Sequence, residues 1–388
     1  MSQKVDPRMS QKVDPRFHEE LAAFGCHDFT QCMNCGNCTA VCALSENKTA
    51  FPRKVIRYVQ LGLKDKLLKS PEPWLCYYCG ECSQTCPRQA NPGEAMMSVR
   101  RWLTTQYDWT GLARKFYLSP LWEFTALAVV AAFVVALFLL FHGPIVTDRV
   151  ELNTFAPVFW VELGDWVLAV GLGSLLLINA IRMVALILSI ERARKIPLTL
   201  WLSELRTLVI HFLTQKRWRD CPSPTRWWKH FLLVSGYLTM MLLVIVLLRW
   251  FQTDGSDWRM MDLLGYYATG TLLFFTGEAI LGRLRRRDEI HKYSHVSDWT
   301  FLVLLFATSL TGIVVHVFRL AGLAMPTYVM YIVHLAVAVP MLVVEVPFGK
   351  WSHLAYRPLA LYLLAIQSRL EEAEAALPVT DALRPAPA

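Results

Sequence analysis

The chain has 388 residues, 54% of them hydrophobic, and a formal net charge of +8. Its Lys and Arg residues gather between long apolar runs, where membrane proteins place them, so the positive charge does not indicate nucleic-acid binding. Nearly all the cysteines precede residue 90, whereas the apolar runs begin only after residue 120, which predicts two regions of different kinds.

The chain opens on a direct repeat. Residues 1–8 recur unchanged as residues 9–16, which we interpret as an artefactual or disordered duplication without function. No apolar run of signal-peptide length precedes the cysteines, so we expect the cysteine region to stay in the cytoplasm. Thiols remain reduced there, and dense cysteine spacing then indicates metal binding rather than disulfides.

Two cysteine runs with the spacing C-x2-C-x2-C-x3-C follow the repeat. Bacterial ferredoxins with two [4Fe–4S] clusters have this spacing, and in them the fourth cysteine of each run binds the other cluster. A pair of structural zinc sites is the alternative, but such sites use cysteine pairs rather than two dense quartets. The predicted ligands are Cys32, Cys35, Cys38 and Cys86 for one cluster, and Cys76, Cys79, Cys82 and Cys42 for the other.

The segment between the two runs predicts helix. Apolar residues recur at helical intervals across residues 51–68, so we expect helices to hold the clusters. Cys26 and Cys221 lie outside both quartets and are predicted to be small, semi-buried side chains rather than ligands. The predicted fold is therefore all-α, with a helical two-cluster ferredoxin-like domain over residues 17–99 and a basic, aromatic connector over residues 100–120.

Six apolar segments follow the connector, each near the ~20 residues that a membrane-spanning helix needs. They cover residues 121–141, 163–190, 229–250, 263–282, 299–318 and 328–348.

The connections between the apolar segments predict an orientation. Those after the second and fourth segments are strongly basic, so the positive-inside rule places them in the cytoplasm with the cysteine domain and the C-terminus. Residues 198–212, in the first of these connections, show an amphipathic pattern that predicts a helix along the membrane surface. We expect a six-span membrane domain over residues 121–360 and a cytoplasmic tail over residues 361–388.

Histidines mark the ends of several predicted spans. His230 opens the third span and His353 follows the sixth, so both lie towards the cytoplasm. His316 and His334 lie towards the outer face. Ionisable residues are costly inside a membrane and are often functional there. Two histidine pairs at matched depths predict two b-type haem sites, stacked so that electrons can cross the membrane.

Alternatives stay open for these polar residues. A membrane histidine is often an interhelical hydrogen-bond partner, and His295 and His142 are the substitutes for a member of either pair. Arg182, Glu278 and Glu345 lie in the inner halves of their spans. Either they form ion pairs or reach to the interface, or Arg182 binds a haem propionate and a glutamate relays a quinone proton.

The order of these parts resembles a known family. Residues 51–68 and 74–102 around the cysteines, and residues 297–319 and 333–359 in the membrane region, carry the resemblance. They resemble the C and E subunits of heterodisulfide reductase fused in one chain, an arrangement found in quinone-interacting membrane-bound oxidoreductase complexes.

A second resemblance concerns the last span. It is similar to the final helix of respiratory nitrate reductase gamma subunits, in which histidines at both ends bind two haems. In this chain those histidines are His334 and His353. That family takes its other two ligands from a single earlier helix, where this chain has His230 and, further in, Met240. The resemblance implies a cytochrome b bundle of the nitrate reductase gamma type.

The family resemblance implies that the chain is one subunit of an oxidoreductase complex in the bacterial inner membrane. Electrons would pass between menaquinol, haem b and the two clusters. Two flavin-containing, heterodisulfide-reductase-A-like subunits and adenylylsulfate reductase are the implied partners, in sulfur metabolism. The alternatives are a membrane anchor of a heterodisulfide-reductase or sulfite-reduction complex and a zinc-stabilised scaffold without redox activity. The chain has no G-x-G-x-x-G fingerprint, so we expect no complete enzymatic cycle from it alone.

Overall fold

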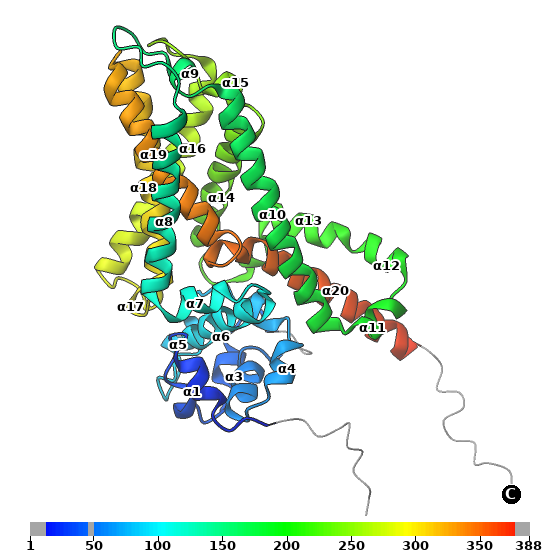
Figure 1. Ribbon diagram of the computed structural model, residues 1–388. Coiled ribbons are helices and arrows are strands. Elements are labelled where there is room, and N and C mark those ends of the chain that lie inside the picture. The colour runs from blue at the N-terminus through cyan, green and yellow to red at the C-terminus, as the bar shows by residue number, and fades with distance from the viewer. Residues whose placement is uncertain (1–12, 46–49, 377–388) are drawn as a thin grey trace, which may run out of the picture.

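The computed structural model describes residues 13–45 and 50–376, and within them every regular element is helical. The predicted all-α fold is confirmed for these residues. Short helices of the first 118 residues gather at one end of the molecule, and the long helices run away from that end (Figure 1). Residues 1–12, which hold most of the direct repeat, lie outside the described residues.

The N-terminal domain is built around helix α6 (Pro92–Tyr107). Pro92 in its first turn and the Asn91 side chain, which accepts a hydrogen bond from the Glu94 amide (3.4 Å), define where this helix begins. The other elements are α1 (Phe17–Ala22), η2 (Phe29–Gln31), α2 (Asn37–Ala40), α3 (Arg53–Gln60), α4 (Lys64–Leu68), η3 (Glu72–Leu75), α5 (Glu81–Gln84) and α7 (Leu112–Leu118).

The helical segment predicted over residues 51–68 folds as two helices, α3 and α4. Gly62 separates them and has a φ of +64°, a conformation that glycine adopts without strain. Val55 and Val59 on α3 and Leu67 on α4 are buried in the core of the domain. Both helices thus help to form the core that supports the loops carrying the cysteines.

Five helices are long and apolar enough to cross a membrane. The predicted fourth span, residues 263–282, lies within α16 (Met260–Leu284), which packs between two of these five but is less apolar. The described residues therefore support a membrane protein, while six spans remain a prediction. The five helices are α8 (Pro120–Phe141), α10 (Val158–Leu188), α14 (Pro224–Ile245), α18 (Val296–Leu320) and α19 (Ala324–Glu345).

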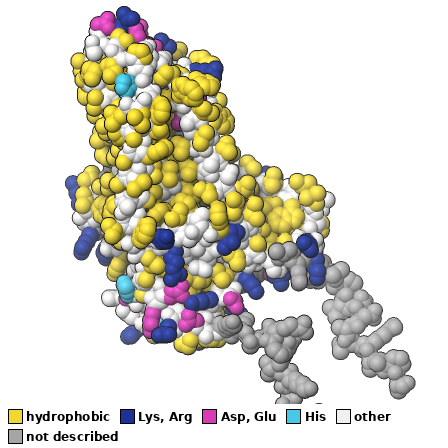
Figure 2. Space-filling view, viewed as in Figure 1, with side chains coloured by type: hydrophobic (Ala, Val, Ile, Leu, Met, Phe, Trp, Pro, Cys, Tyr) yellow, Lys and Arg dark blue, Asp and Glu magenta, His cyan; other side chains and the backbone are white. Residues whose placement is uncertain are grey.

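The surface of the long helices is apolar. Leu140 on α8 and Trp160 on α10 are 74% and 65% exposed, which is unfavourable in water and expected against lipid. Figure 2 shows hydrophobic side chains covering this part of the molecule, with charged side chains concentrated at its two ends. This distribution is that of a bundle embedded in a membrane.

Elements from both basic connections lie at the same end of the bundle as the N-terminal domain (Figure 1). The helix predicted over residues 198–212 is present in two pieces. The opposite end carries α9 (Leu152–Phe155) and α15 (Leu248–Phe251). The elements at the N-terminal-domain end are α11 (Ile190–Lys195), α12 (Leu198–Ser203), α13 (Leu205–Thr214), η4 (Lys216–Asp220) and α17 (Glu289–Lys292).

The C-terminal segment differs from the predicted tail. After η5 (Lys350–Ser352), helix α20 (His353–Ala376) continues past residue 361 and lies beside α13. Its Leu363 and Ile366 are buried in a core shared with α6 and α10. The partners that bury Leu363 and Ile366 lie on distant helices, which is why a tail was predicted where residues 361–376 form a docked helix.

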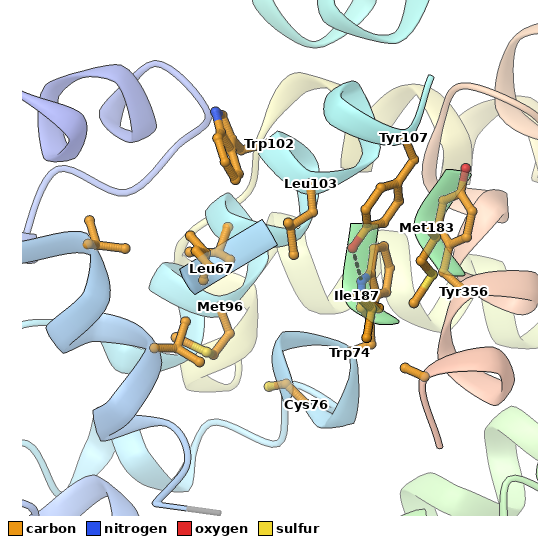
Figure 3. Packing of buried hydrophobic residues seen from close by; sticks show 14 of the residues in the cluster. Leu67, Trp74, Cys76, Met96, Trp102, Leu103, Tyr107, Met183, Ile187 and Tyr356 are labelled. Carbon is orange, nitrogen blue, oxygen red and sulfur yellow. Dashed lines mark hydrogen bonds between the residues drawn. The ribbon is translucent and has the colours of Figure 1, made fainter. Parts of the chain in front are cut away.

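Aromatic side chains join the N-terminal domain to the membrane part. Trp74, Tyr107 and Tyr356 pack edge to face, with ring centroids 5.1 Å apart for Trp74–Tyr356 and 5.3 Å apart for Tyr107–Tyr356. The Trp74 indole donates to the Tyr107 hydroxyl (3.3 Å; Figure 3). Met183 and Ile187 of α10 belong to the same buried cluster. The two parts of the chain thus share one continuous hydrophobic core.

A buried ion-pair network reinforces this junction. Arg101 on α6 binds Glu94 (2.7 Å) and Asp298 at the start of α18 (2.8 Å), and Lys350 also binds Asp298 (2.6 Å). Since Arg101 and Glu94 are almost completely buried, solvent does not screen their interaction.

Replacing Arg101 by methionine is expected to weaken the junction. Glu94 would then be buried without a cation, and breaking a buried pair costs about 3–5 kcal/mol. The exposed Arg369–Glu204 pair provides the control, because Arg369→Ala removes an interaction of about 0–1 kcal/mol. Thermal melting of both variants in detergent measures the difference, and equal melting temperatures would contradict the prediction.

Candidate redox centres

The first predicted cysteine quartet comes together in the structure. Gly36, in a left-handed conformation (φ +90°), starts α2 directly after Cys35. The Asn37 amide side chain donates to the Thr85 carbonyl (2.6 Å), which joins the first cysteine loop to the residue preceding Cys86. Burial, and then the neighbouring Cys32, Cys35 and Cys86 thiols, raise the pKa of Cys38, so the four predicted members lie near one another.

The second quartet lines one pocket. Phe51 and Pro52 give this pocket an apolar wall. The Tyr78 amide lies 3.3 Å from Sγ of Cys76, and in the first quartet the Ala90 amide lies 3.4 Å from Sγ of Cys86. Backbone N–H groups directed at cysteine sulfurs suit bound thiolates, so both quartets fit iron–sulfur clusters. The pocket's predicted ligands are Cys42, Cys76, Cys79 and Cys82.

In the described residues, no three or more His, Cys, Asp or Glu side chains are placed to hold a single metal ion.

A fifth cysteine, Cys221, lines the second pocket as well. It follows η4, far beyond Cys86 in the chain, and it is 5% exposed. It packs in the same small cluster as Cys79, and its thiol lowers the pKa of Cys79. Cys221 is more deeply buried than the semi-buried side chain that was predicted, and its contact with the quartet was missed. A lone cysteine in a loop carries no spacing signal, so only the fold reveals this contact.

His230 and His353 face each other. Their ring centroids are 6.5 Å apart. Nδ1 of His230 is hydrogen-bonded to Oε1 of Gln215 (2.5 Å), and Nδ1 of His353 is hydrogen-bonded to the carbonyl of Lys350. Histidines that bind a metal usually donate their other ring N–H to such an oxygen, which orients the ring. The arrangement leaves Nε2 of each ring available to a ligand between them.

The spacing of these two rings fits a shared iron. An imidazole nitrogen lies about 2 Å from a metal that it binds and about 1 Å from its own ring centre, so two opposed imidazoles would have centroids about 6 Å apart. The observed 6.5 Å agrees with this value. The two residues come from α14 and from the start of α20, so the fold brings together positions that are widely separated in the chain.

The two histidines predicted to lie towards the outer face, His316 and His334, have different hydrogen-bond partners from the first pair. The Tyr266 hydroxyl is hydrogen-bonded to Nε2 of His316 (2.7 Å), and Arg319 donates to its Nδ1 (3.4 Å). Nδ1 of His334 is hydrogen-bonded to the Thr311 hydroxyl (3.0 Å). Because both nitrogens of His316 are engaged, it is the weakest of the four haem candidates.

The two substitute histidines have structural roles. His295 caps α18 by accepting a hydrogen bond from the Ser297 amide (3.3 Å). His142 stacks on Phe155 and is hydrogen-bonded to the Gly143 carbonyl.

The three charged residues predicted inside spans have separate surroundings. Arg182 donates to the carbonyls of Tyr107 (2.8 Å) and Gln106 (3.3 Å) at the end of α6, so it caps a helix instead of lying at the histidine pair. These carbonyl partners could not be predicted from the place of Arg182 in its apolar segment. Glu278 forms an ion pair with Lys229. Glu345 is 1% exposed and accepts a hydrogen bond from the Lys350 amide (2.8 Å).

Two aromatic rings connect the second quartet to the histidine pair. Tyr77, adjacent to Cys76, stacks on Trp218 with ring centroids 5.0 Å apart. Trp218 in turn lies 4.6 Å from His230. In the described residues, the buried Tyr77 hydroxyl and Trp218 indole nitrogen have no hydrogen-bond partner, so both are available to a bound group.

Two arginines contact the loop that carries Cys76 and Tyr77. Arg100 is half-buried and Arg357 is buried. Arg357 donates to the Cys76 carbonyl (3.0 Å) and lies over the Tyr77 ring, and Arg100 also donates to the Cys76 carbonyl (3.1 Å). Desolvation, and then the like charge of Arg357, lower the pKa of Arg100 to about 9. Among the described residues neither arginine has a carboxylate partner. Their positive charge suits an anionic group such as a thiolate-bound cluster.

These two arginines were not predicted from the sequence. Arg357 follows His353 by one helical turn, and this i, i+4 spacing was the signal that could have indicated it.

Comparisons with known proteins agree with the cysteine geometry. A family model described as a 4Fe-4S dicluster domain matches residues 28–90. A protein of Archaeoglobus profundus, named for its likeness to the C subunit of heterodisulfide reductase, is 35% identical over 96 residues, which are 24% of this chain and 51% of that protein. The C subunit of the H(2):CoB-CoM heterodisulfide,ferredoxin reductase of Methanothermobacter marburgensis is 34% identical over 73 residues, 19% of this chain and 40% of that protein.

A third relative is the iron-sulfur C subunit of the CoB–CoM heterodisulfide reductase of Methanopyrus kandleri. It is 36% identical over 69 residues, 18% of this chain and 36% of that protein. The chain thus spans about half or less of the length of these curated relatives. No solved structure matches it. Residues 28–90 thus match a dicluster domain of the kind that holds two [4Fe–4S] clusters, this region is similar to C subunits of heterodisulfide reductases, and the described residues also include five helices long and apolar enough to cross a membrane.

Proposed function

We propose that this chain transfers electrons between a quinone in the membrane and soluble redox partners. In this proposal His230 and His353 bind a b-type haem, and the two cysteine quartets bind the clusters. One cluster is held by Cys32, Cys35, Cys38 and Cys86, and the other by Cys76, Cys79, Cys82 and Cys42.

The observation that carries the proposal is the placement of the histidine pair beside the second quartet. The pair faces inward across 6.5 Å, and Tyr77 and Trp218 fill the space between it and the cysteine loop. A haem bound there supplies one-electron exchange with both a quinol and a cluster. The Arg100 and Arg357 guanidiniums, which both donate to the Cys76 carbonyl, would offset negative charge at the cluster.

The two quartets have different positions on the route. The second faces the membrane part through Tyr77 and Cys221. The first reaches the surface, since Cys35 and the neighbouring Met33 are exposed. We therefore propose the order quinone, histidine pair, second quartet, first quartet and soluble partner.

Glu345 is the better candidate for moving a quinone proton. It is buried, and among the described residues no cation pairs with it, whereas Glu278 is held by Lys229. We propose His334 as a ligand of a second, outer haem, with His316 as its partner only if the His316 ring leaves the Tyr266 hydroxyl.

The biological setting is proposed from the family resemblance. Menaquinol is the proposed quinone, and two flavin-containing, heterodisulfide-reductase-A-like subunits and adenylylsulfate reductase are the proposed partners. The cluster domain and the C-terminus lie in the cytoplasm of a bacterium in this proposal. The relatives' names favour an alternative soluble partner, since they are subunits of heterodisulfide reductases. Flavoproteins that co-purify with the chain, and the acceptor that they reduce, would distinguish the two.

Adding a menaquinol analogue to the purified protein in detergent tests the proposal. The absorbance bands of reduced haem b should appear first, followed by bleaching of the iron–sulfur absorbance. Bleaching without any haem signal would contradict the proposed route.

Replacing Trp218 by leucine is expected to slow electron transfer between haem and cluster several-fold, because the substitution removes the ring that links Tyr77 to His230. Haem and iron contents should not change. Trp227→Leu is the matched control, since Trp227 is a buried tryptophan nearby whose ring packs on Trp228 and Phe231 instead. Stopped-flow spectroscopy after quinol addition measures the rate, and equal rates for the two variants would argue against the aromatic route.

A further inference from the structure

We propose that Cys221 is a positioning residue for the second cluster: its S–H donates a hydrogen bond to Sγ of Cys79 and thereby raises the reduction potential of that cluster. This inference rests on the proposed role of Cys79 as a cluster ligand. It assigns a redox function to a cysteine that belongs to the membrane part of the chain.

The position of Cys221 is defined by its neighbours. It is 5% exposed, packs with Leu44, Tyr77 and Trp218, and lines the pocket of the second quartet. Its amide donates to the Trp218 carbonyl (3.1 Å), which closes the turn after η4. The backbone at Cys221 is therefore tied to Trp218, whose ring stacks on Tyr77.

The segment around Cys221 holds both cysteine loops of the second quartet. Arg226 donates to the Cys79 carbonyl (2.7 Å), and Arg217 donates to the Leu44 carbonyl (3.4 Å) next to the Cys42 loop. These contacts hold Cys221 beside Cys79 in the pocket of the second quartet. The position of Cys221 is therefore fixed by specific hydrogen bonds of its own segment, and not only by apolar packing.

The direction of the hydrogen bond follows from the chemistry of the partners. A thiolate bound to iron has no proton to donate, so the shared proton belongs to Cys221. Hydrogen bonds to cluster sulfurs withdraw negative charge and favour the reduced, more negative cluster. The reduction potential therefore rises with the bond and falls when the bond is removed.

The contact also connects the cluster to the membrane part. Cys221 lies three residues after Trp218, which is next to His230. One short segment therefore carries both the Trp218 ring, which lies on the proposed electron route, and the Cys221 thiol, which adjusts the reduction potential of the second cluster.

An EPR-monitored redox titration of the full-length protein in detergent tests the inference. Cys221→Ala should keep about eight non-haem irons and lower the midpoint potential of one cluster only. The size of this shift converts to an equilibrium: a potential lower by about 59 mV means a tenfold smaller ratio of reduced to oxidised cluster. Cys221→Ser retains a donor and should retain most of the wild-type potential. Cys26→Ala is the matched control, since Cys26 is also buried but lies outside the quartets, and it should shift neither cluster.

Unchanged midpoint potentials in both Cys221 variants would overturn the inference. Loss of about four irons from Cys221→Ala and Cys221→Ser, together with their retention in Cys42→Ser, would also overturn it, because Cys221 would then be a ligand in place of Cys42. A wild-type protein without clusters would instead refute the proposed function, and the iron content distinguishes this outcome from the others.

Discussion

Replacing His353 by alanine is expected to remove the haem on the N-terminal-domain side. The His353 ring faces His230 across 6.5 Å, and a six-coordinate haem that loses one of two imidazoles is bound far more weakly. The b-type absorbance should fall by the contribution of one haem, while about eight non-haem irons remain. Pyridine haemochrome and iron assays on the purified protein measure both quantities.

A second variant and a control make this result specific. His230→Ala should remove the same haem, and the double variant should lose no more than either single variant, because the two rings serve one site. His142→Ala should leave the haem content unchanged, since His142 stacks on Phe155 away from the pair. Full haem content in His353→Ala would refute the assignment.

Replacing Cys79 by serine is expected to remove the second cluster. Cys79 lines the pocket with three other cysteines of its quartet, and a hydroxyl is a poor ligand for iron beside sulfide. About four of the expected eight non-haem irons should be lost, with the same number of sulfides, and the haem content should not change. Iron and acid-labile sulfide assays, with EPR of the reduced protein, measure the loss.

The crosswise ligand arrangement can be tested with the same assays. Cys42→Ser should remove the EPR signal that Cys79→Ser removes, and Cys86→Ser should remove the other one. Cys26→Ser should keep both signals, because Cys26 is buried outside the quartets. If Cys42→Ser and Cys86→Ser removed each other's expected signal, each run would bind its own cluster, contrary to the arrangement proposed.

Much of the site could be predicted because its signals are local. Ferredoxin-type spacing is readable without a structure, and a family model matches the same residues. The pairing of His230 with His353 was predicted from the order of the apolar segments, and the two ring centroids lie 6.5 Å apart in the structure. Hydropathy also predicted the five helices that are long and apolar enough to cross a membrane.

The rest depends on contacts between distant segments, which spacing does not encode. Arg182 was assigned a haem propionate as one option from its depth, yet its partners are carbonyls at the end of α6. Trp218 and Cys221 lie in a basic loop whose charge suggested only orientation, although the loop folds against the second quartet. Burial of α20 was hidden for the same reason, since its partners lie on α10 and α13.

The most direct test of the central claim is the cofactor content of the purified full-length protein. Iron, acid-labile sulfide, zinc and haem are measured on one sample of known protein concentration. Two [4Fe–4S] clusters and a haem at the histidine pair predict about eight non-haem irons, about eight sulfides and at least one b-type haem per chain. Zinc without sulfide or haem would contradict the account and would leave the metal-stabilised scaffold as the function of this chain.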